Sequence, residues 1–170
     1  MIAIREARPG DRDAILAVTL AAYEQYADTL TPAFWALYRQ NIQDTLADVG
    51  TAAQIVAEDE GAILGSVLLL PAGAVIGNPR AAIALEWPEV RLLAVAPEAR
   101  GNGVARRLMD ECLRRARTAG ASALTLHTTD MMAAAMRLYE RMGFARAPEL
   151  DFRPAPEILV KGYRRMLPRS

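Results

Sequence analysis

A short glycine-containing segment of the chain has the composition of a phosphate-binding turn. The segment Arg100 to Ala105 (Arg-Gly-Asn-Gly-Val-Ala) follows the apolar run Val90 to Val95 and opens a stretch with helical periodicity, Val104 to Arg117. Glycines adopt backbone angles that other residues avoid, and they let a ligand approach the chain closely. The first N–H groups of a helix lack partners within the helix and, with the helix dipole, favour anions. The segment therefore predicts a pyrophosphate site.

The spacing of this segment excludes two common phosphate-binding motifs. A dinucleotide-binding turn needs a third glycine where Arg106 stands, and a P-loop needs Lys followed by Ser or Thr, which no glycine segment supplies. The pattern that fits is Arg/Gln-x-x-Gly-x-Gly/Ala, formed by Arg100, Gly103 and Ala105 after the stretch Leu93 to Glu98. This pattern resembles motif A of the GNAT family of N-acetyltransferases, which bind acetyl-coenzyme A.

A second segment strengthens the resemblance. The stretch Ala135 to Phe144 ends in Leu-Tyr-Glu-x-x-Gly-Phe, with the tyrosine at Tyr139, and is similar to the other hallmark helix of the family. The two motifs have the family's usual separation. The resemblance is therefore specific from Glu89 to Phe144 and is compatible with the rest of the chain.

The resemblance implies an enzyme that moves an acetyl group from acetyl-coenzyme A to a primary amine of a small molecule or amino acid. Attack is direct, within a ternary complex, and needs no metal. The resemblance further implies that a bulge splays the strand Glu89–Ala96, whose backbone then pairs with the pantetheine arm and presents one N–H to the thioester oxygen. The expected cofactor-binding residues are Leu93, Ala94, Val95, Arg100, Gly101, Asn102, Gly103, Val104, Ala105, Arg106, Thr129 and Met132.

Acyl transfer to an amine needs a group that accepts the amine proton and a group that protonates the departing thiolate. Tyr139 is the expected acid, because the tyrosine at this motif position lies near the coenzyme sulfur in the family. Glu89, at the start of the central strand, is the expected base. Glu86, His127 and a chain of waters remain alternatives for the base.

One residue departs from the family pattern. Where relatives often have an asparagine seven residues before the tyrosine, this chain has Met132. Thr128, Thr129 or Asp130 can supply the missing polar contact, although Asp130 is more typical of a cap for the helix that follows. Arg106 and Arg107 are candidates for a ribose-phosphate contact, and the alternative is a solvated helix face.

Composition restricts the class of protein. The chain has 170 residues, 52% of them hydrophobic, and zero formal net charge. This length predicts a single domain, residues 1–170, which the resemblance implies to be an N-acetyltransferase domain, and the charge gives no reason to expect nucleic acid. No apolar run is long enough for a membrane and no secretion signal is apparent, so we expect a cytoplasmic protein. The partner that the resemblance implies is a small-molecule amine. The single cysteine, Cys112, falls on an apolar helical stripe and is expected in the core. The oligomeric state stays open, a homodimer included.

The order of predicted elements indicates a mixed, mostly antiparallel α/β sheet of about six or seven strands with helices on both faces, splayed between the fourth and fifth strands. The expected strands are Ile2–Glu6, Ala53–Glu58, Ile63–Pro71, Glu89–Ala96, Ala123–Thr128, Phe144–Ala147 and Ile158–Leu167. The Asp59-Glu60-Gly61 turn predicts that the second and third of these strands form an antiparallel hairpin. The expected helices are Asp11–Tyr26, Thr31–Val49, Val104–Arg117 and Met131–Met142. The second helix is predicted to begin with Thr31 as its cap and Pro32 in its first turn.

Two stretches, Ala72–Leu85 and Pro148–Pro156, are predicted to be irregular, and long loops often line binding sites. With the first helical pair they offer mainly apolar and aromatic surface. This surface favours a compact amine with an apolar body over a polycationic peptide. Two alternatives remain open: a module that binds acyl-coenzyme A without turnover, and an acetyltransferase that acts on protein N-termini or lysines.

Overall fold

The computed structural model describes residues 1–77 and 79–169, which divide into two units. The first unit comprises Met1–Leu69 and Leu92–Cys112, and the second comprises Leu70–Arg91 and Leu113–Ser170. Strand β6 (Glu89–Val95) and helix α3 (Val104–Thr118) contribute residues to both.

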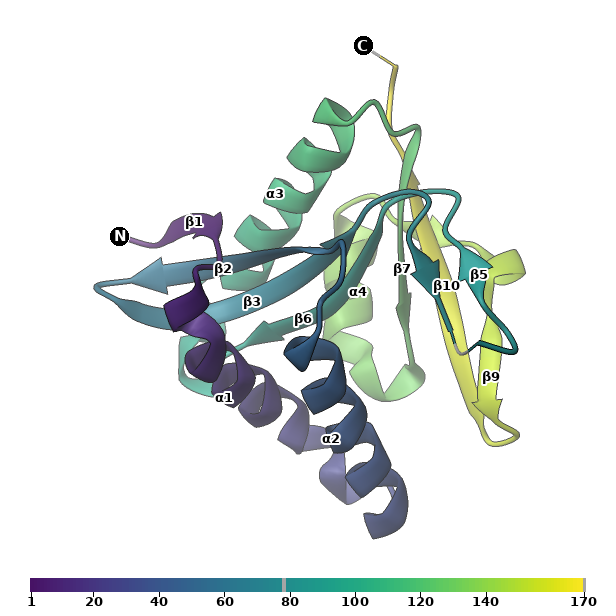
Figure 1. The fold of residues 1–170 in the computed structure, drawn as a ribbon, viewed down its shortest axis with the longest axis horizontal. Coiled ribbons are helices and arrows are strands. Elements are labelled where there is room, and N and C mark those ends of the chain that lie inside the picture. The colour runs from purple at the N-terminus through teal and green to yellow at the C-terminus, as the bar shows by residue number, and fades with distance from the viewer. Residues whose placement is uncertain (78, 170) are drawn as a thin grey trace. The chain divides into compact units, whose positions relative to one another are not determined.

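The first unit contains three strands and two helices besides its parts of β6 and α3 (Figure 1). These elements are β1 (Ala3–Glu6), α1 (Arg12–Tyr23), α2 (Pro32–Ala47), β2 (Ala53–Asp59) and β3 (Ala62–Leu70), with short 3-10 turns at Pro9–Asp11, Glu24–Thr29 and Pro97–Ala99. The predicted Thr31 cap is confirmed, since its hydroxyl accepts a hydrogen bond from the Phe34 N–H at 3.2 Å. The first helix ends at Tyr23, three residues before the predicted end, because the chain tightens there into a 3-10 turn.

The predicted hairpin between β2 and β3 is confirmed, and its turn explains the pairing. Glu60 and Gly61 have φ angles of 49° and 84°. Positive φ at both central residues is the backbone of a type I′ turn, whose twist matches that of antiparallel strands. The two strands pair from Ala53↔Leu69 to Asp59↔Ala62, with one shift of register between Ala57 and Glu58.

Neighbouring residues of β3 face helices on opposite sides. A Cβ on Gly65 would lie 3.0 Å from Cγ1 of Val104 in α3, so α3 packs closely on this face. The hydroxyl of the next residue, Ser66, lies 3.5 Å from that of Thr19 in α1. Successive side chains of a strand alternate between faces, and Figure 1 shows α1 on one side of β3 and the start of α3 on the other.

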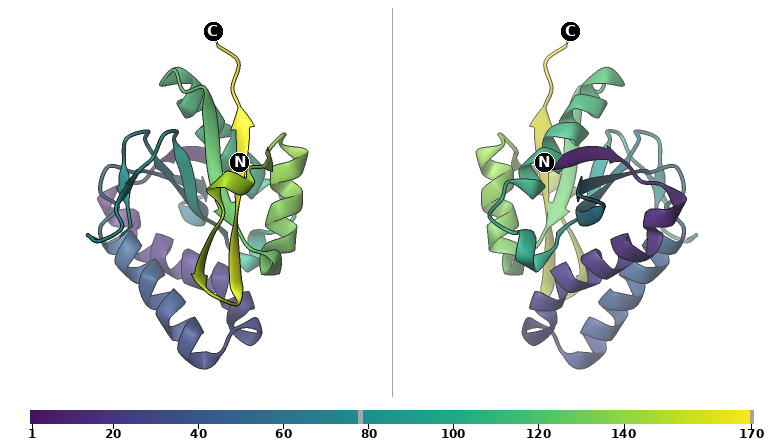
Figure 2. Two further views of the ribbon diagram at one scale, coloured as in Figure 1. Left: turned by 90° about the vertical axis from the view of Figure 1, so that its right-hand side faces the viewer. Right: turned by 90° about the vertical axis from the view of Figure 1, so that its left-hand side faces the viewer.

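The second unit contains two short strands that pair with each other, β4 (Val75–Ile76) and β5 (Ile83–Ala84). It also contains β7 (Ala123–Thr128), α4 (Ala133–Arg141), β8 (Ala145–Arg146), β9 (Phe152–Ala155) and β10 (Ile158–Met166). Strand β10 pairs antiparallel with β7, β8 and β9. Helix α4 packs on the β10 face that carries Tyr163, whose hydroxyl contacts Sδ of Met136 at 3.7 Å, and Figure 2 shows the helix alongside β7 and β10.

Within the described residues, the main sheet has eight strands, in the order β1-β2-β3-β6-β7-β10-β8 with β9 paired to β10. The prediction of a mixed, mostly antiparallel sheet is confirmed, but the predicted count was low. Strands β6 and β7 form the parallel pair, and their register covers Glu89↔Thr125 and Val90↔Leu126. The sheet splits beyond these pairs, at the place that the sequence predicted. The backbone of β6 is irregular there, because Leu92 has a φ of 49°.

Both stretches predicted to be irregular contain strands, so those predictions were wrong. Residues 72–85 hold the two-residue pairs of β4 and β5, although Asn78 lies outside the described residues. Residues 148–156 hold a 3-10 turn, Pro148–Leu150, and then β9. Such short strands form because their backbone N–H and C=O groups pair with a neighbouring segment. They are too short to show an apolar pattern in the sequence. Among the helices described, none is both long enough and apolar enough to cross a membrane.

Candidate active site

The predicted phosphate-binding turn has the backbone of an anion cradle. Gly101 and Gly103 have φ angles of 80° and 75°, and a Cβ placed on either glycine would meet no atom within 4 Å. The open space lies at the start of α3, where the first helical hydrogen bond runs from the Arg107 N–H to the Gly103 carbonyl at 3.0 Å. The N–H groups before Arg107 are those that a helix leaves without internal partners. Glycines, open space and donors at one helix start fit a pyrophosphate.

Two side chains brace the cradle rather than point into it. The Arg100 guanidinium donates a hydrogen bond to the Ala22 carbonyl at the end of α1, at 3.2 Å. The Asn102 amide donates to the Ala99 carbonyl at 3.2 Å. Both contacts fix the turn in front of the helix. That Arg100 and Asn102 contribute to coenzyme binding stays a prediction, and these contacts favour a contribution through the shape of the backbone.

The arginines on the first turn of α3 differ in availability. Arg107 donates to the Ile2 carbonyl at 3.1 Å and is thereby tied to the N-terminal strand. The Arg106 side chain is 59% exposed, with its guanidinium 3.6 Å from the Asp110 carboxylate. Since an exposed, loosely paired arginine can turn toward a phosphate at little cost, Arg106 suits the ribose-phosphate role better than Arg107.

The irregular part of β6 presents backbone groups in the first unit. Leu92 has a φ of 49°, which interrupts the alternation of side chains that a regular strand would have. The carbonyl of Leu93 accepts a hydrogen bond from the Tyr23 hydroxyl at 3.3 Å. A left-handed leucine is uncommon and costs conformational energy, which makes this bend a candidate functional feature.

Glu89 is a buried, ion-paired carboxylate in the second unit. It is 1% exposed, and each of its oxygens lies beside a basic side chain. Oε1 lies 2.8 Å from Nδ1 of His127, and Oε2 lies 2.9 Å from Nε of Arg91. Burial by itself raises the pKa of Glu89, but the hydrogen bond and charge of His127, together with Arg91, outweigh burial and leave the pKa below its ordinary value. The carboxylate is therefore ionised at neutral pH.

His127 has partners on both ring nitrogens. Besides the contact with Glu89, its Nε2 lies 2.9 Å from the Leu150 carbonyl oxygen. The ring of Phe152 meets the imidazole edge-on, with centroids 5.4 Å apart. Burial by itself lowers the pKa of His127, but the hydrogen bond and charge of Glu89 reverse that effect and leave the pKa raised.

Two buried threonine hydroxyls lie at the end of β7. The Oγ1 atoms of Thr128 and Thr129 are buried, and neither has a hydrogen-bond partner in the part of the chain that the structure describes. A buried hydroxyl without a partner costs about 1–3 kcal/mol, so such groups commonly await a ligand or water. The structure thus leaves polar groups available close to Met132, where the family's asparagine is missing.

The expected cap on the helix after β7 was wrong. Asp130 lies within the 3-10 turn Asp130–Met132, and its carboxylate pairs with the Lys161 ammonium. The residue at the N-cap of α4 is Met132, which supplies no side-chain cap. Asp130 forms this ion pair instead of capping the helix, because Lys161 lies opposite Thr128 in the register of β10 with β7 and is within reach of the turn.

Tyr139 is buried on α4, 6% exposed, and packs edge-on against Phe144 with ring centroids 6.1 Å apart. Cys112 is fully buried in α3, as predicted for a core thiol. The structure thus joins Glu89 to His127 and Arg91 within the second unit, which also holds Tyr139. The predicted turn and the Leu93–Val95 backbone lie in the first unit.

Sequence reasoning missed two partners of this cluster. The Leu150 carbonyl is a backbone group and gives no sequence signal. Phe152 is 49% exposed and lies in a stretch that was read as loop. An exposed aromatic between polar residues was the signal that could have identified it.

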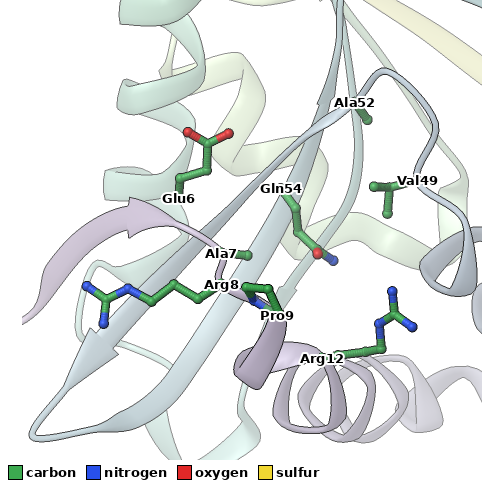
Figure 3. Close-up of a pocket in the computed structure, with 8 residues that line it drawn as sticks. All are labelled: Glu6, Ala7, Arg8, Pro9, Arg12, Val49, Ala52 and Gln54. Carbon is green, nitrogen blue, oxygen red and sulfur yellow. The ribbon is translucent and has the colours of Figure 1, made fainter.

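The first unit also has a surface pocket of about 270 Å³ that none of the predicted residues line (Figure 3). Its lining residues are Glu6, Ala7, Arg8, Pro9, Arg12, Val49, Ala52 and Gln54. Figure 3 shows the Arg8 side chain extended away from the others, so the pocket does not gather its charges around one point. Within residues 1–77 and 79–169, no three His, Cys, Asp or Glu side chains are grouped to hold a metal ion.

Comparison with known proteins places the chain in a family. A family model described as the acetyltransferase (GNAT) family matches residues 19–144. The chain is 40% identical over 87 residues to the IAA acetyltransferase of Azospirillum brasilense, a match that covers 49% of this chain and 57% of that protein. The chain therefore spans little more than half the length of this relative.

Solved structures agree on the fold. An acetyltransferase of the GNAT family from Staphylococcus aureus Mu50 matches with a TM-score of 0.73 at 15% identity, covering 99% of this chain and all of that chain. A GNAT family acetyltransferase from Brucella melitensis, solved in complex with acetyl-CoA, matches with a TM-score of 0.61 at 22% identity, covering 100% of this chain and 93% of that chain. Since the matched residues 19–144 contain the glycine turn, Glu89 and Tyr139, the chain belongs to the acetyltransferase (GNAT) family.

Proposed function

We propose that this chain transfers an acetyl group from acetyl-CoA to a primary amine of a small molecule or amino acid. The observation that carries the proposal is the glycine turn before α3, where Gly101 and Gly103 have positive φ and border open space. A turn of this kind has no packing reason to keep glycine, but it suits close approach by a pyrophosphate. Family membership supports the same cosubstrate.

The proposed coenzyme contacts use backbone groups first. Leu93, Ala94 and Val95 would pair with the pantetheine arm in the manner of an added strand, and the turn from Arg100 to Ala105 would hold the pyrophosphate. Arg106 would reach the ribose phosphate. The Thr129 hydroxyl, buried and without a partner in the described part of the chain, would supply the polar contact that Met132 cannot make.

The proposed chemistry assigns one proton transfer to each of two residues. Glu89 takes a proton from the substrate ammonium, directly or through water, which frees the nitrogen lone pair to form the C–N bond as the C–S bond breaks. Tyr139 gives its proton to the departing thiolate and regains one through solvent from the newly acylated nitrogen. A reference thiol pKa of about 8.5 against about 10 for a phenol makes this donation slightly uphill in water, so groups of the bound site would have to favour it.

A module that holds acyl-CoA without turnover is the second candidate. It is favoured by the engagement of both Glu89 oxygens, with His127 at 2.8 Å and Arg91 at 2.9 Å. A carboxylate held in this way is a weaker base, because both partners stabilise its ionised form.

Initial-velocity measurements separate the two candidates. Thiol release is followed with a thiol-reactive dye over a panel of primary amines while acetyl-CoA and amine are varied together. The enzyme proposal expects amine-dependent release with intersecting double-reciprocal lines, as direct attack in a ternary complex requires. Coenzyme binding by calorimetry with no release across the whole panel would instead support the binding module. Parallel lines would contradict direct attack.

A further inference from the structure

The His127 imidazole faces a hydrogen-bond acceptor on each of its two nitrogens. A backbone carbonyl has lone pairs and no hydrogen, so the 2.9 Å contact between Nε2 and the Leu150 oxygen requires a hydrogen on Nε2. An ionised carboxylate is likewise only an acceptor, so the 2.8 Å contact between Nδ1 and the Glu89 Oε1 requires a hydrogen on Nδ1. Both hydrogens are present together only in the imidazolium.

We propose that His127 is a positioning residue, an imidazolium that fixes the orientation of the Glu89 carboxylate and ties it to the backbone at Leu150. The proposal rests on the proposed function in one respect, because it matters for catalysis only if Glu89 is the base. Arg91 holds the other carboxylate oxygen, so His127 and Arg91 together define the plane of the carboxylate. Charge-assisted hydrogen bonds of this kind are short and directional.

The charges that face His127 from neighbouring elements support the imidazolium. Glu89 on β6 is in contact, whereas Arg91 opposes the charge from farther along the same strand. Asp151, next to Leu150, is the second nearby carboxylate, but Arg146 pairs with both of its oxygens, at 2.8 and 2.7 Å.

On β10, the residue opposite His127 in the register is Gly162, which carries no charge. The adjacent Lys161 is paired with Asp130 and contributes little net charge. The contact with Glu89 therefore dominates the balance, and the pKa of His127 lies above its ordinary value.

Loss of one proton from His127 must break this arrangement. A neutral imidazole has a single N–H, so it can satisfy the Leu150 carbonyl or Glu89 but not both. One acceptor then faces a lone pair inside a site where the imidazole side chain is only 19% exposed. We therefore expect the Glu89 carboxylate to lose its fixed orientation as pH rises through the pKa of His127. The turnover rate should fall over the same pH range.

The test begins with a measurement that does not depend on activity. His127 is the only histidine of the chain, so one imidazole signal set in an NMR titration belongs to it. The expected result is an imidazolium with both nitrogens protonated at neutral pH, and a downward shift of its pKa in the Glu89→Gln variant. An imidazole that is neutral at pH 7 in the intact protein would overturn the proposal, whatever the activity.

Two variants then separate positioning from simple structural support. The Asn side-chain nitrogen lies near the position of Nδ1 and the Gln nitrogen near that of Nε2, so His127→Asn keeps a donor for Glu89 and His127→Gln keeps one for Leu150. We expect His127→Gln to lose about tenfold or more in kcat, a loss typical of small misplacements, with little change in KM for acetyl-CoA. His127→Asn should retain more of kcat, and both variants should lose the alkaline fall of the pH profile.

Equal kcat in the two variants and the wild type, or an unchanged alkaline limb, would overturn the positioning role. Failure of the proposed function has a different signature. If the wild-type protein releases no thiol with any amine while NMR still shows the imidazolium, the clamp on Glu89 stands and the enzymatic role falls.

Discussion

At the residue scale, the Glu89 carboxylate is ionised although it is buried, because His127 and Arg91 form the polar contacts that water would otherwise provide. Burial disfavours a carboxylate, but His127 and Arg91 each hold one oxygen, and the pKa falls below its ordinary value. The same contacts that keep the carboxylate ionised also reduce its basicity. Glu89 is therefore in the form that can accept a proton, and its two partners set how basic that form is.

Replacing Glu89 with glutamine tests its role as the base. General-base contributions of about 10²–10⁴-fold lead us to expect a loss of at least about 100-fold in kcat, with the calorimetric affinity for acetyl-CoA retained. The matched control is Glu60→Gln, since Glu60 is an exposed carboxylate in the turn between β2 and β3, outside the proposed site. A Glu89→Gln variant with the kcat of the control would show that another group, or solvent, takes the proton.

The His127 contacts also predict a pH dependence of stability. The pKa of His127 is raised in the folded state above 6.5, so its contribution is complete below about pH 6.5 and is lost as pH rises through the folded pKa. Over that window the free energy of unfolding of the wild type should fall by at most about 1.4 kcal/mol per pH unit relative to His127→Asn. Urea unfolding of both proteins across this range measures the difference. Parallel curves would mean that the folded protein does not favour the imidazolium.

At the element scale, the start of α3 combines two features that a helix seldom needs for stability. Gly101 and Gly103 take left-handed angles, and neither is forced to be glycine by a neighbouring atom. The space beside them is open, and unpaired N–H groups face it at the positive end of the helix dipole. These features support the proposal that the start of α3 binds a phosphate group.

Gly103→Val should separate these roles. A branched side chain would project into the open space and strain the backbone at φ 75°, so we expect at least about a tenfold loss of coenzyme affinity by calorimetry, equivalent to 1.4 kcal/mol. Gly120→Val is the matched control, because Gly120 follows the other end of α3 with φ 74° and equally open surroundings. The control should show the same backbone strain and unchanged affinity. Wild-type affinity in a folded Gly103→Val protein would refute the cradle.

Elements with a local signal were predictable from the sequence. The Asp59-Glu60-Gly61 turn predicted the hairpin of β2 and β3, and Thr31 with Pro32 predicted the start of α2. Strands β4, β5 and β9 were missed because two to four residues at the edge of a fold carry no apolar period. The positive φ of Leu92 was hidden because leucine gives no sign of a left-handed angle.

For the candidate site, the sequence identified single residues but not the contacts between them. Glu89 and His127 were each singled out, but their contact depends on the pairing of Glu89 with Thr125, a long-range register. The Leu150 carbonyl could not be predicted, because every residue has one. Asp130 was assigned to a cap because the competing partner, Lys161, lies 31 residues away in the chain.

At the scale of the whole molecule, charge balance bears on the acceptor. The chain has 20 basic and 20 acidic residues, so no net field steers a polycation toward it. We expect small amines with an apolar or aromatic body to have a higher kcat/KM than lysine-rich peptides at physiological salt, where exposed charges are screened. A clear preference for the basic peptide would point to a protein acetyltransferase instead.

The fate of the acetyl group tests the proposed function most directly. Acetyl-CoA that carries a heavy-isotope acetyl label is incubated with the protein and the best amine of the panel, and mass spectrometry follows amine, coenzyme and protein together. The proposal predicts labelled N-acetyl amine and free coenzyme thiol in equal amounts, no acetyl on the protein, and strong suppression of both products in Glu89→Gln. Label that accumulates on the protein, or thiol release that does not require the amine, would contradict direct transfer from acetyl-CoA to an amine.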